Sequence, residues 1–444
     1  MISIINKENC SGCSACASRC PKQCISMKSD KEGFLYPFVD QSSCVDCGIC
    51  DKVCHELHPF DERKPIQVFG SFNSDLQVRL ESSSGGIFLN LAQQILNQGG
   101  IVFGAKFDDN WQVLLDYANS ISELKAFVGS KYVQARVGTA FVDCERFLKQ
   151  GRIVMFSGTP CQIAGLKHYL KKEYQNLFTL DLACHGAPSP LAWNRYLLDF
   201  LDLTDKIISN FSLYNRAYWK WRKYNVQINV QGNYIDFLSS NQVNPYLISM
   251  KENLILRPSC HFCKAGNGRS SSDVTLADFW GISQFKNIDD ESRGYSLVSV
   301  NSGKGMALVS KGRFEKFNIC YADVIKNFKT GCKPHIDRDC FLESIQMGLS
   351  LPDSFQRIKK SNIQTTANHI LTQLKGLIKG WLIEYQLFKH NRVELKKLNI
   401  GRNKNLKLVS ISFRDKTFGW NKYSLRLKCK TNYENRNSNT TIAK

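Results

Sequence analysis

The sequence predicts a multidomain chain of the α+β and α/β classes, and three features of its 444 residues lead to this expectation. Cysteines are concentrated in residues 1–60. Segments typical of strands and helices alternate through the middle of the chain, as they do in mixed α/β domains. Residues 355–444 are helical in pattern, then irregular, and rich in lysine and arginine. We therefore expect a small cysteine-rich module, a mixed α/β domain and a helical basic C-terminal tail.

Two runs of cysteines share the spacing C-x2-C-x2-C-x3-C. This spacing is typical of bacterial two-cluster ferredoxins, in which the fourth cysteine of each run binds the cluster of the other run. It assigns one [4Fe–4S] cluster to Cys10, Cys13, Cys16 and Cys54, and a second to Cys44, Cys47, Cys50 and Cys20. The first run is followed by Pro21, whereas His55 follows the second. Because that proline is not a ligand, the assignment of the second run stands.

Zinc and disulfide bonds explain these cysteines less well. Zinc sites use two separated cysteine pairs, not four cysteines within eleven residues. Disulfides need an oxidising compartment, and the N-terminal sequence MISIINKENC has no basic start followed by an apolar run. No stretch approaches the roughly 18 apolar residues of a membrane span. We therefore expect a cytoplasmic protein that handles electrons.

The net charge of +20 is unevenly distributed. Residues 356–444 hold 20 Lys and Arg against 4 Asp and Glu, and so carry +16 of this charge. This tail is either a solvated helix surface with a disordered end, or a surface for an acidic partner or for anionic lipid at the inner face of the membrane. The sequence leaves both readings open. Nucleic acid is not an expected partner, because no reader motif accompanies the charge.

Changes in composition suggest the domain boundaries. The expected units are residues 1–60, a ferredoxin-like module; 66–150 and 151–325, the two parts of a mixed α/β domain; and 355–444, the basic extension. Short strands are expected in the module at residues 2–5, 24–27 and 35–39. Residues 58–65 are polar, contain proline and predict a linker. Further on, a helix over 87–97 ends at a Gly-Gly pair, and a strand follows over 101–107.

A β-α-β-α unit comes next. Strands are expected at 152–156 and 177–183, and each precedes a helix that starts with a capping hydroxyl and a proline, Thr159-Pro160 and Ser189-Pro190. This order predicts neighbouring parallel strands with a right-handed crossover. Residues 205–300 have a larger share of strand patterns, notably at 224–230 and 296–300.

Four further cysteines are candidates for a third [4Fe–4S] cluster. Cys161 and Cys184 each follow the carboxyl end of a predicted strand, where α/β proteins place their ligand sites. Cys260 and Cys263 form a C-x2-C step. Half of a zinc site, or ordinary buried cysteines, remain alternatives on spacing alone. The other cysteines are interpreted as structural: Cys24, Cys144, Cys320, Cys332, Cys340 and Cys429.

A polar turn and a later loop are candidates for binding a phosphate-bearing cofactor. Residues 82–86, SSSGG, precede a helix, and such a turn can present backbone N–H groups and hydroxyls to an anion. Lys131, in the loop 129–132, can supply a cation. The turn is neither a G-x-G-x-x-G nor a Walker sequence, and a turn that only caps a helix explains it equally well.

Several segments together resemble the β subunits of coenzyme F420-dependent hydrogenase and dehydrogenase, including bacterial relatives with an N-terminal two-cluster ferredoxin domain. The resemblance covers about residues 1–325. It is carried by residues 81–86 (ESSSGG), 129–134 (GSKYVQ), 158–166 (GTPCQIAGL), 184–186 (CHG), 257–263 (RPSCHFC), 273–282 (DVTLADFWGI) and 294–298 (GYSLV).

The resemblance implies FAD in addition to iron–sulfur clusters, and a third cluster on Cys161, Cys184, Cys260 and Cys263. It makes Ser83, Ser84, Gly85, Gly86, Lys131 and Tyr132 the candidates for flavin contact. Members of the family act on the deazaflavin coenzyme or on chlorophyll-type pigments, or accompany polysaccharide-biosynthesis enzymes. The Asn/Lys/Ile-rich composition and the basic tail favour the last group.

These observations predict an FAD- and [4Fe–4S]-dependent oxidoreductase. A ferredoxin or another redox protein would exchange electrons with the N-terminal clusters, and FAD would exchange them with a small organic substrate or a deazaflavin-type coenzyme. No catalytic residue is assigned, although Lys131, His185 and Asp278 are candidates. The alternatives are a non-enzymatic electron-transfer subunit that docks to a partner oxidoreductase, and a flavin-free scaffold.

Overall fold

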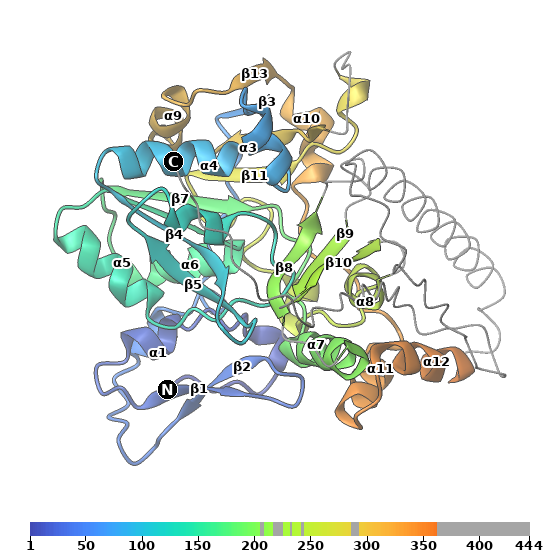
Figure 1. Ribbon diagram of the computed structural model, residues 1–444. Helices are drawn as coiled ribbons and strands as arrows, with labels where there is room; N and C mark the ends of the chain where they lie inside the picture. Colours follow the sequence, from blue (N-terminus) through green and yellow to red (C-terminus); the bar gives the residue numbers. More distant parts are fainter. Residues whose placement is uncertain (205–207, 216–224, 231–232, 241–243, 286–292, 362–444) are drawn as a thin grey trace, which may run out of the picture.

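A computed structural model describes residues 1–361 with the exception of 205–207, 216–224, 231–232, 241–243 and 286–292 (Figure 1). The basic extension predicted for 355–444 therefore lies outside the described residues, apart from its start in helix α12 (Leu351–Ser361). The described part of the chain holds no helix that is long and apolar enough to cross a membrane.

The N-terminal module contains a short antiparallel hairpin between two cysteine loops. Its elements are η1 (Lys7–Asn9), α1 (Ala15–Arg19), β1 (Ile25–Ser29), β2 (Leu35–Val39) and α2 (Ile49–Lys52). The strand predicted at 35–39 is confirmed, and the one at 24–27 lies one to two residues later. The strand predicted at 2–5 was wrong. Ile2 is buried there, and its backbone N–H points to the sulfur of Cys50 at 3.3 Å, not to a partner strand.

An eight-stranded mixed sheet forms the body of the protein. Its order is β13 (Glu315–Asn318), β3 (Gln67–Phe72), β12 (Ser296–Val300), β11 (Val274–Asp278), β7 (Leu177–Leu182), β6 (Val154–Gly158), β4 (Ile101–Phe107) and β5 (Val113–Ala118). The four strands β11, β7, β6 and β4 run parallel, and the flanking strands pair antiparallel. The predicted strands at 101–107 and 296–300 and the parallel pairing of β6 with β7 are confirmed.

Helices cover both faces of this sheet, as Figure 1 shows. Alternate residues of the strands face opposite layers, since side chains alternate along a strand. Val102, Met155 and Leu180 pack in the cluster that includes α4 (Ile87–Asn97) and α9 (Gly303–Ser310). Phe103 and Phe156 pack in the cluster that includes α5 (Ala140–Lys149) and α6 (Pro160–Leu170). The predicted helix at 87–97 is confirmed.

The turns that start α6 and α7 (Pro190–Thr204) formed as predicted. The N–H of Thr159 donates to Oε1 of Gln162 at 2.9 Å, and the N–H of Ala192 donates to the hydroxyl of Ser189 at 3.1 Å. Proline follows each capping residue, where its missing N–H costs no helical hydrogen bond. Cys161 is therefore fixed in the first turn of α6.

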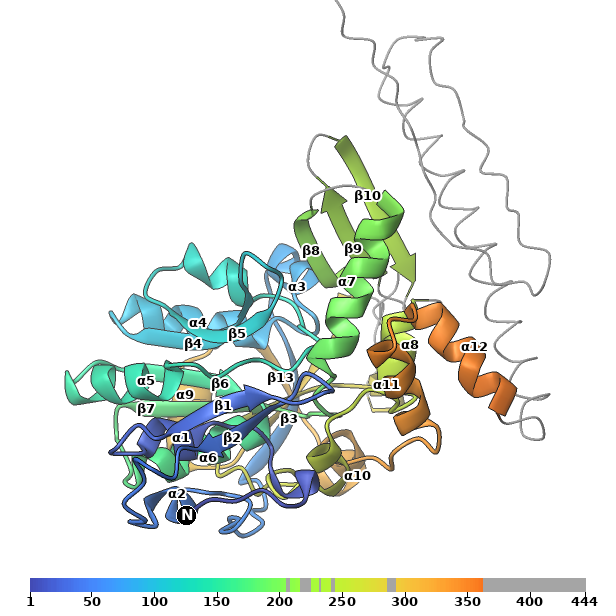
Figure 2. The same ribbon diagram turned by 90° about the horizontal axis from the view of Figure 1, so that it is seen from below.

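A second unit extends from the body beyond α7 (Figure 2). It contains the antiparallel strands β8 (Ile208–Asn215), β9 (Asn225–Val230) and β10 (Asn233–Ser240) and the helix α8 (Pro245–Lys251). The remaining short elements are α3 (Leu76–Glu81), η2 (Glu123–Phe127), η3 (Pro258–Phe262), η4 (Ile282–Gln284), α10 (Tyr321–Val324), η6 (Ile325–Asn327) and α11 (Arg338–Gln346).

A buried ion pair ties the N-terminal module to α11. Arg338 donates to both carboxylate oxygens of Glu32, at 2.5 and 3.2 Å, and to the carbonyl of Leu256 at 2.8 and 3.0 Å. Glu32 and Arg338 are each 7% exposed. The backbone carbonyl of Glu32 also accepts from the hydroxyl of Ser189 at 2.6 Å. These contacts hold the module against the segment that leads to Cys260.

Candidate iron–sulfur centres

The first group of thiols forms around α1. Burial is the largest cause that raises the pKa of Cys16, to about 12, and the charges of Cys10 and Cys54 are the next. Burial also raises the pKa of Cys13, and the charges of Cys16, Cys10 and Cys54 add to the effect. The four cysteines that the spacing assigned to one cluster are therefore near neighbours, with Cys54 contributed by the second run.

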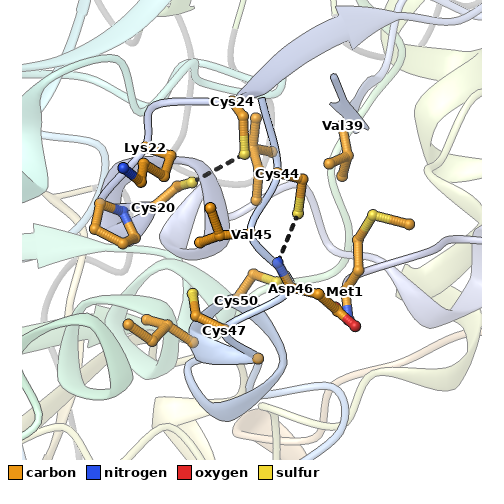
Figure 3. Close-up of a pocket in the computed structure, with 14 residues that line it drawn as sticks. Met1, Cys20, Lys22, Cys24, Val39, Cys44, Val45, Asp46, Cys47 and Cys50 are labelled. Atoms are coloured by element: carbon orange, nitrogen blue, oxygen red, sulfur yellow. Dashed lines mark hydrogen bonds and ion pairs between the residues drawn. The ribbon is translucent and has the colours of Figure 1, made fainter. Parts of the chain in front are cut away.

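The second group lines a small cavity at the other end of the module (Figure 3). Cys20, from the first run, borders this cavity together with Cys44, Cys47 and Cys50 from the second. Cys47 is exposed, whereas Cys50 is buried. The exchange of the fourth cysteine between the two runs thus has a geometric basis at both sites.

Cys24 is an additional thiol at the second site, although its spacing led us to interpret it as structural. Its sulfur lies 3.4 Å from that of Cys20, as Figure 3 shows, and it lines the same cavity. Hydrogen bonding to Cys20 and burial raise the pKa of Cys24 to about 11. The only signal in the sequence was its position four residues after Cys20.

The third group combines thiols from three distant segments. Cys161 lies in the first turn of α6, and Cys184 follows β7. Cys260 lies in η3, and Cys263 follows its last residue. Burial raises the pKa of Cys184, and the charges of Cys260, Cys161 and Cys263 raise it further. Burial also raises the pKa of Cys161 and of Cys260 to about 12. The structure therefore brings together the four cysteines proposed for a third cluster.

The first group is next to both of the others. The charge of Cys50, from the second group, is among the causes that raise the pKa of Cys16. On the other side, Gly165 of α6 lies so close to Cys13 that an added Cβ would be 2.9 Å from its sulfur. The charge of Glu56, a carboxyl that is 5% exposed, acts on Cys10 of the first group and on Cys161 of the third.

The donor set and its packing fit cubane clusters. Each group supplies four thiols, which is the ligand count of a [4Fe–4S] cluster. Among the described residues, no three His, Cys, Asp or Glu side chains converge as they would on a single metal ion. In a cubane cluster each of the four irons binds one thiolate. The four sulfur ligands are therefore farther from one another than the ligands of a single metal ion. Bound iron would hold the thiols deprotonated, and its positive charge would compensate the mutual repulsion of the thiolates.

The two segments proposed for flavin contact meet although 47 residues separate them. The hydroxyl of Ser83 accepts from the backbone N–H of Ser130 at 2.7 Å, and the two hydroxyls lie 3.0 Å apart. Gly86, with φ of +82°, starts α4, and no side chain caps that end of the helix. The first N–H groups of α4 can therefore donate hydrogen bonds to an anion such as a phosphate.

Other atoms of these segments are used by the protein itself. The N–H of Gly85 donates to the hydroxyl of Ser296 at 2.9 Å, and the hydroxyl of Ser84 donates to the carbonyl of Tyr295 at 2.8 Å. Lys131 donates to the carbonyls of Ala126 and Val128, at 2.8 and 2.9 Å, and burial lowers its pKa to about 7. The residues present therefore fit a phosphate bound to the first N–H groups of α4. They do not fit one bound along the whole turn 82–86, because Ser84 and Gly85 are already bonded to the protein.

The histidines beside the ligands make bonds to the protein. His185 pairs with Oδ1 of Asn253 at 2.7 Å, and Nδ1 of His261 lies 2.8 Å from the carbonyl of Cys332. The sulfur of Cys332 itself lies 3.7 Å from this Nδ1. Asp278 is the last residue of β11 and lies two positions before Trp280 in the chain. None of these contacts identifies a catalytic acid or base.

Comparison with known proteins supports an iron–sulfur class for this fold and these thiols. Residues 9–56 match the family model of a 4Fe-4S dicluster domain, which spans both cysteine runs. Residues 151–319 match the family model for the C terminus of the coenzyme F420 hydrogenase/dehydrogenase beta subunit. The chain is thus an iron–sulfur protein related to the coenzyme F420 hydrogenase/dehydrogenase β subunits, and the resemblance noted in the sequence is confirmed.

Two individual proteins are similar to parts of this chain. One of the subunits of the F420H2 dehydrogenase of Methanosarcina mazei is 24% identical over 168 residues, which are 36% of this chain and 48% of that protein. The chain therefore matches about half the length of this curated relative. A chain of the F420-reducing [NiFe] hydrogenase complex from Methanosarcina barkeri aligns with a TM-score of 0.41 and 16% identity, over 69% of this chain and 95% of that one.

Proposed function

We propose that the protein is an iron–sulfur flavoprotein oxidoreductase that passes electrons between a ferredoxin-like redox protein and, through FAD, an organic substrate or a deazaflavin-type coenzyme. The observation that carries the proposal is the position of the first group of thiols, next to both the second and the third. Three clusters held by these groups would carry single electrons from the exposed edge at Cys47 to the interior at Cys161.

The side chains of the two N-terminal runs and of α6 would do two things. They would bind each cluster through four thiolates, and they would limit the access of water to the first and third sites, whose cysteines are only partly exposed. The exposed Cys47 would leave the second site as the point of contact with a redox partner.

The loop 129–134 supports a connection between the clusters and the flavin candidates. Ser130 contacts Ser83 at one end, and Gln134 at the other donates to the carbonyl of Ser11 at 3.0 Å, beside the first group of thiols. Four residues of extended chain span at most about 14 Å, so the two sites would be close. A flavin bound there would convert single electrons into a hydride equivalent.

A second candidate is a non-enzymatic electron-transfer subunit. It is favoured by the turn 82–86, where the N–H of Gly85 is already bonded to Ser296 and an added Cβ would lie 2.7 Å from the carbonyl oxygen of Ser71. A turn packed in this way has a structural role in starting α4, and that role needs no flavin. The domain boundaries and the roles of the tail in lipid or partner binding and in polysaccharide biosynthesis stay predictions.

The deciding experiment counts iron and flavin in protein purified without oxygen. We expect about 12 irons per chain, from four per cubane, and one FAD. Cys161→Ser should lose about four of these irons, while the core thiol variant Cys144→Ser should keep all of them, because Cys144 is fully buried in α5 among apolar side chains. Equal iron in both variants would refute the third cluster.

The flavin part has its own matched pair. Gly86→Ala and Gly99→Ala both place a side chain at a positive φ, +82° and +71°, at opposite ends of α4. Only Gly86 lies in the turn proposed to bind FAD. We expect Gly86→Ala to lose flavin and Gly99→Ala to retain it. A chain with full iron and no flavin in the unmodified protein would support the electron-transfer subunit.

A further inference from the structure

Arg257 is a fully buried cation between the first and third groups of thiols. Its exposed fraction is 0%, and it caps η3, three residues before Cys260. Its guanidinium stacks over the ring of Tyr36, with Cζ 4.2 Å from the ring centroid. Arginine is rarely buried in this way unless an anion lies beside it.

The bonds of the guanidinium converge on Cys10. Nε donates to the carbonyl oxygen of Cys10 at 2.8 Å, and Nη2 points to its sulfur at 3.7 Å. The remaining bonds go to neutral acceptors, Oε1 of Gln134 and the carbonyl of Leu35, both at 3.0 Å. The guanidinium plane is therefore held by the protein with one edge toward a proposed cluster ligand.

Arg257 has no carboxylate within ion-pair distance among the residues that the structure describes. The other buried arginine near the module, Arg338, has Glu32 for this purpose. Because Nη2 lies 3.7 Å from the sulfur of Cys10, a thiolate at that position would compensate this buried charge. The charge of Arg257 also acts on the buried carboxyl of Glu56, which lies outside ion-pair distance.

Among the described residues that line its cavity, the second group has no equivalent of Arg257. The cavity of that group is lined by one cationic side chain, the exposed Lys22, and by the N-terminal amine of Met1. That amine is already paired with Asp46 and Asp51, each at 3.0 Å. The two runs therefore have the same ligand spacing but different surroundings of charge.

We infer that Arg257 raises the reduction potential of the first cluster above that of the second, and so directs electrons from the module's edge to its interior. This rests on the proposed cluster ligands. Net charge and hydrogen bonds to sulfur are among the factors that set such potentials. With both clusters bound, one electron would pass from the second to the first, with no bond broken or formed and no proton transferred. Arg257 favours the product because it stabilises the added negative charge.

The test is a potentiometric titration of the clusters in the full-length protein, followed by electron paramagnetic resonance. We expect Arg257→Gln to lower the potential of the first cluster by at least 59 mV, which is a tenfold shift in a one-electron equilibrium. The first cluster is recognised as the signal lost in Cys16→Ser. The signal of the second cluster should not move.

Arg79→Gln is the matched control. Arg79 is also buried, at 4% exposed, stacks over Phe72 and Tyr295, and donates to the carbonyl of Gly294 at 2.7 Å. It should leave both potentials unchanged. Equal potentials of the first cluster in Arg257→Gln and the unmodified protein would overturn the inference.

If Arg257→Gln fails to bind iron at the first site, Arg257→Met carries the test. It removes the charge and the donors that point to sulfur, but keeps an unbranched side chain that can pack over Tyr36. A lower potential with full iron would support the inference, and an unchanged one would overturn it. Absence of flavin or of the third cluster would refute the proposed function and would not affect this measurement.

Discussion

The contact between Gly165 and Cys13 gives the sharpest prediction, because it joins two candidate centres through one helix. In Gly165→Ala the new Cβ would lie 2.8 Å from Cβ and 2.9 Å from the sulfur of Cys13. Carbon atoms pack at about 3.5–4.0 Å, so α6 or the loop of Cys13 must move by about 0.7 Å or more. Any movement of α6 also displaces Cys161 at its start.

Two opposing effects set the size of the change. Alanine in place of glycine inside a helix stabilises by about 1 kcal/mol. Overpacking of a close contact costs about 1–3 kcal/mol. We expect a net loss of up to about 2 kcal/mol in the free energy of unfolding, together with reduced iron at the first and third sites.

The assay measures iron per chain and denaturant unfolding, both without oxygen. Gly303→Ala is the control, because Gly303 is also helical and its added Cβ would meet nothing within 4 Å. That variant should keep full iron and equal or greater stability. If Gly165→Ala behaves in the same way, then α6 does not rest on the first site and the reasoning fails.

Three further outcomes are expected. Arg338→Leu should lose about 3–5 kcal/mol of stability in denaturant unfolding, because it leaves the carboxylate of Glu32 buried and unpaired, and Glu32→Gln should restore part of the loss. Between pH 7 and about 10.5 the free energy of unfolding should rise, because burial lowers the pKa of Lys131 from 10.5 to about 7. In this range the folded state binds fewer protons than the unfolded state. Lys131→Met should flatten this rise. Cys24→Ser should keep full iron, because four other thiols surround the second site; loss of about four irons would make Cys24 a ligand.

Local patterns were sufficient for much of the fold. The helix over 87–97 and the strands over 35–39, 101–107 and 296–300 were predicted with the bounds that they have, since apolar periodicity and flanking glycines mark such elements. The strand predicted at 2–5 failed, because Ile2 is buried with its N–H directed at the sulfur of Cys50, whereas Ile5 is 97% exposed. An apolar residue such as Ile2 has the same place in the sequence pattern whether a partner strand or another segment buries it.

The sequence by itself determined the two cysteine runs, the exchange of their fourth members and the turn that starts α6 at Cys161. These features depend on residues close in the chain, where spacing fixes geometry. Only the tertiary structure decided that Cys161, Cys184 and Cys260 meet, that Cys24 joins the second site and that Arg257 lies against Cys10. Such contacts depend on how the sheet order and the hairpin place distant segments, and no single segment encodes that placement.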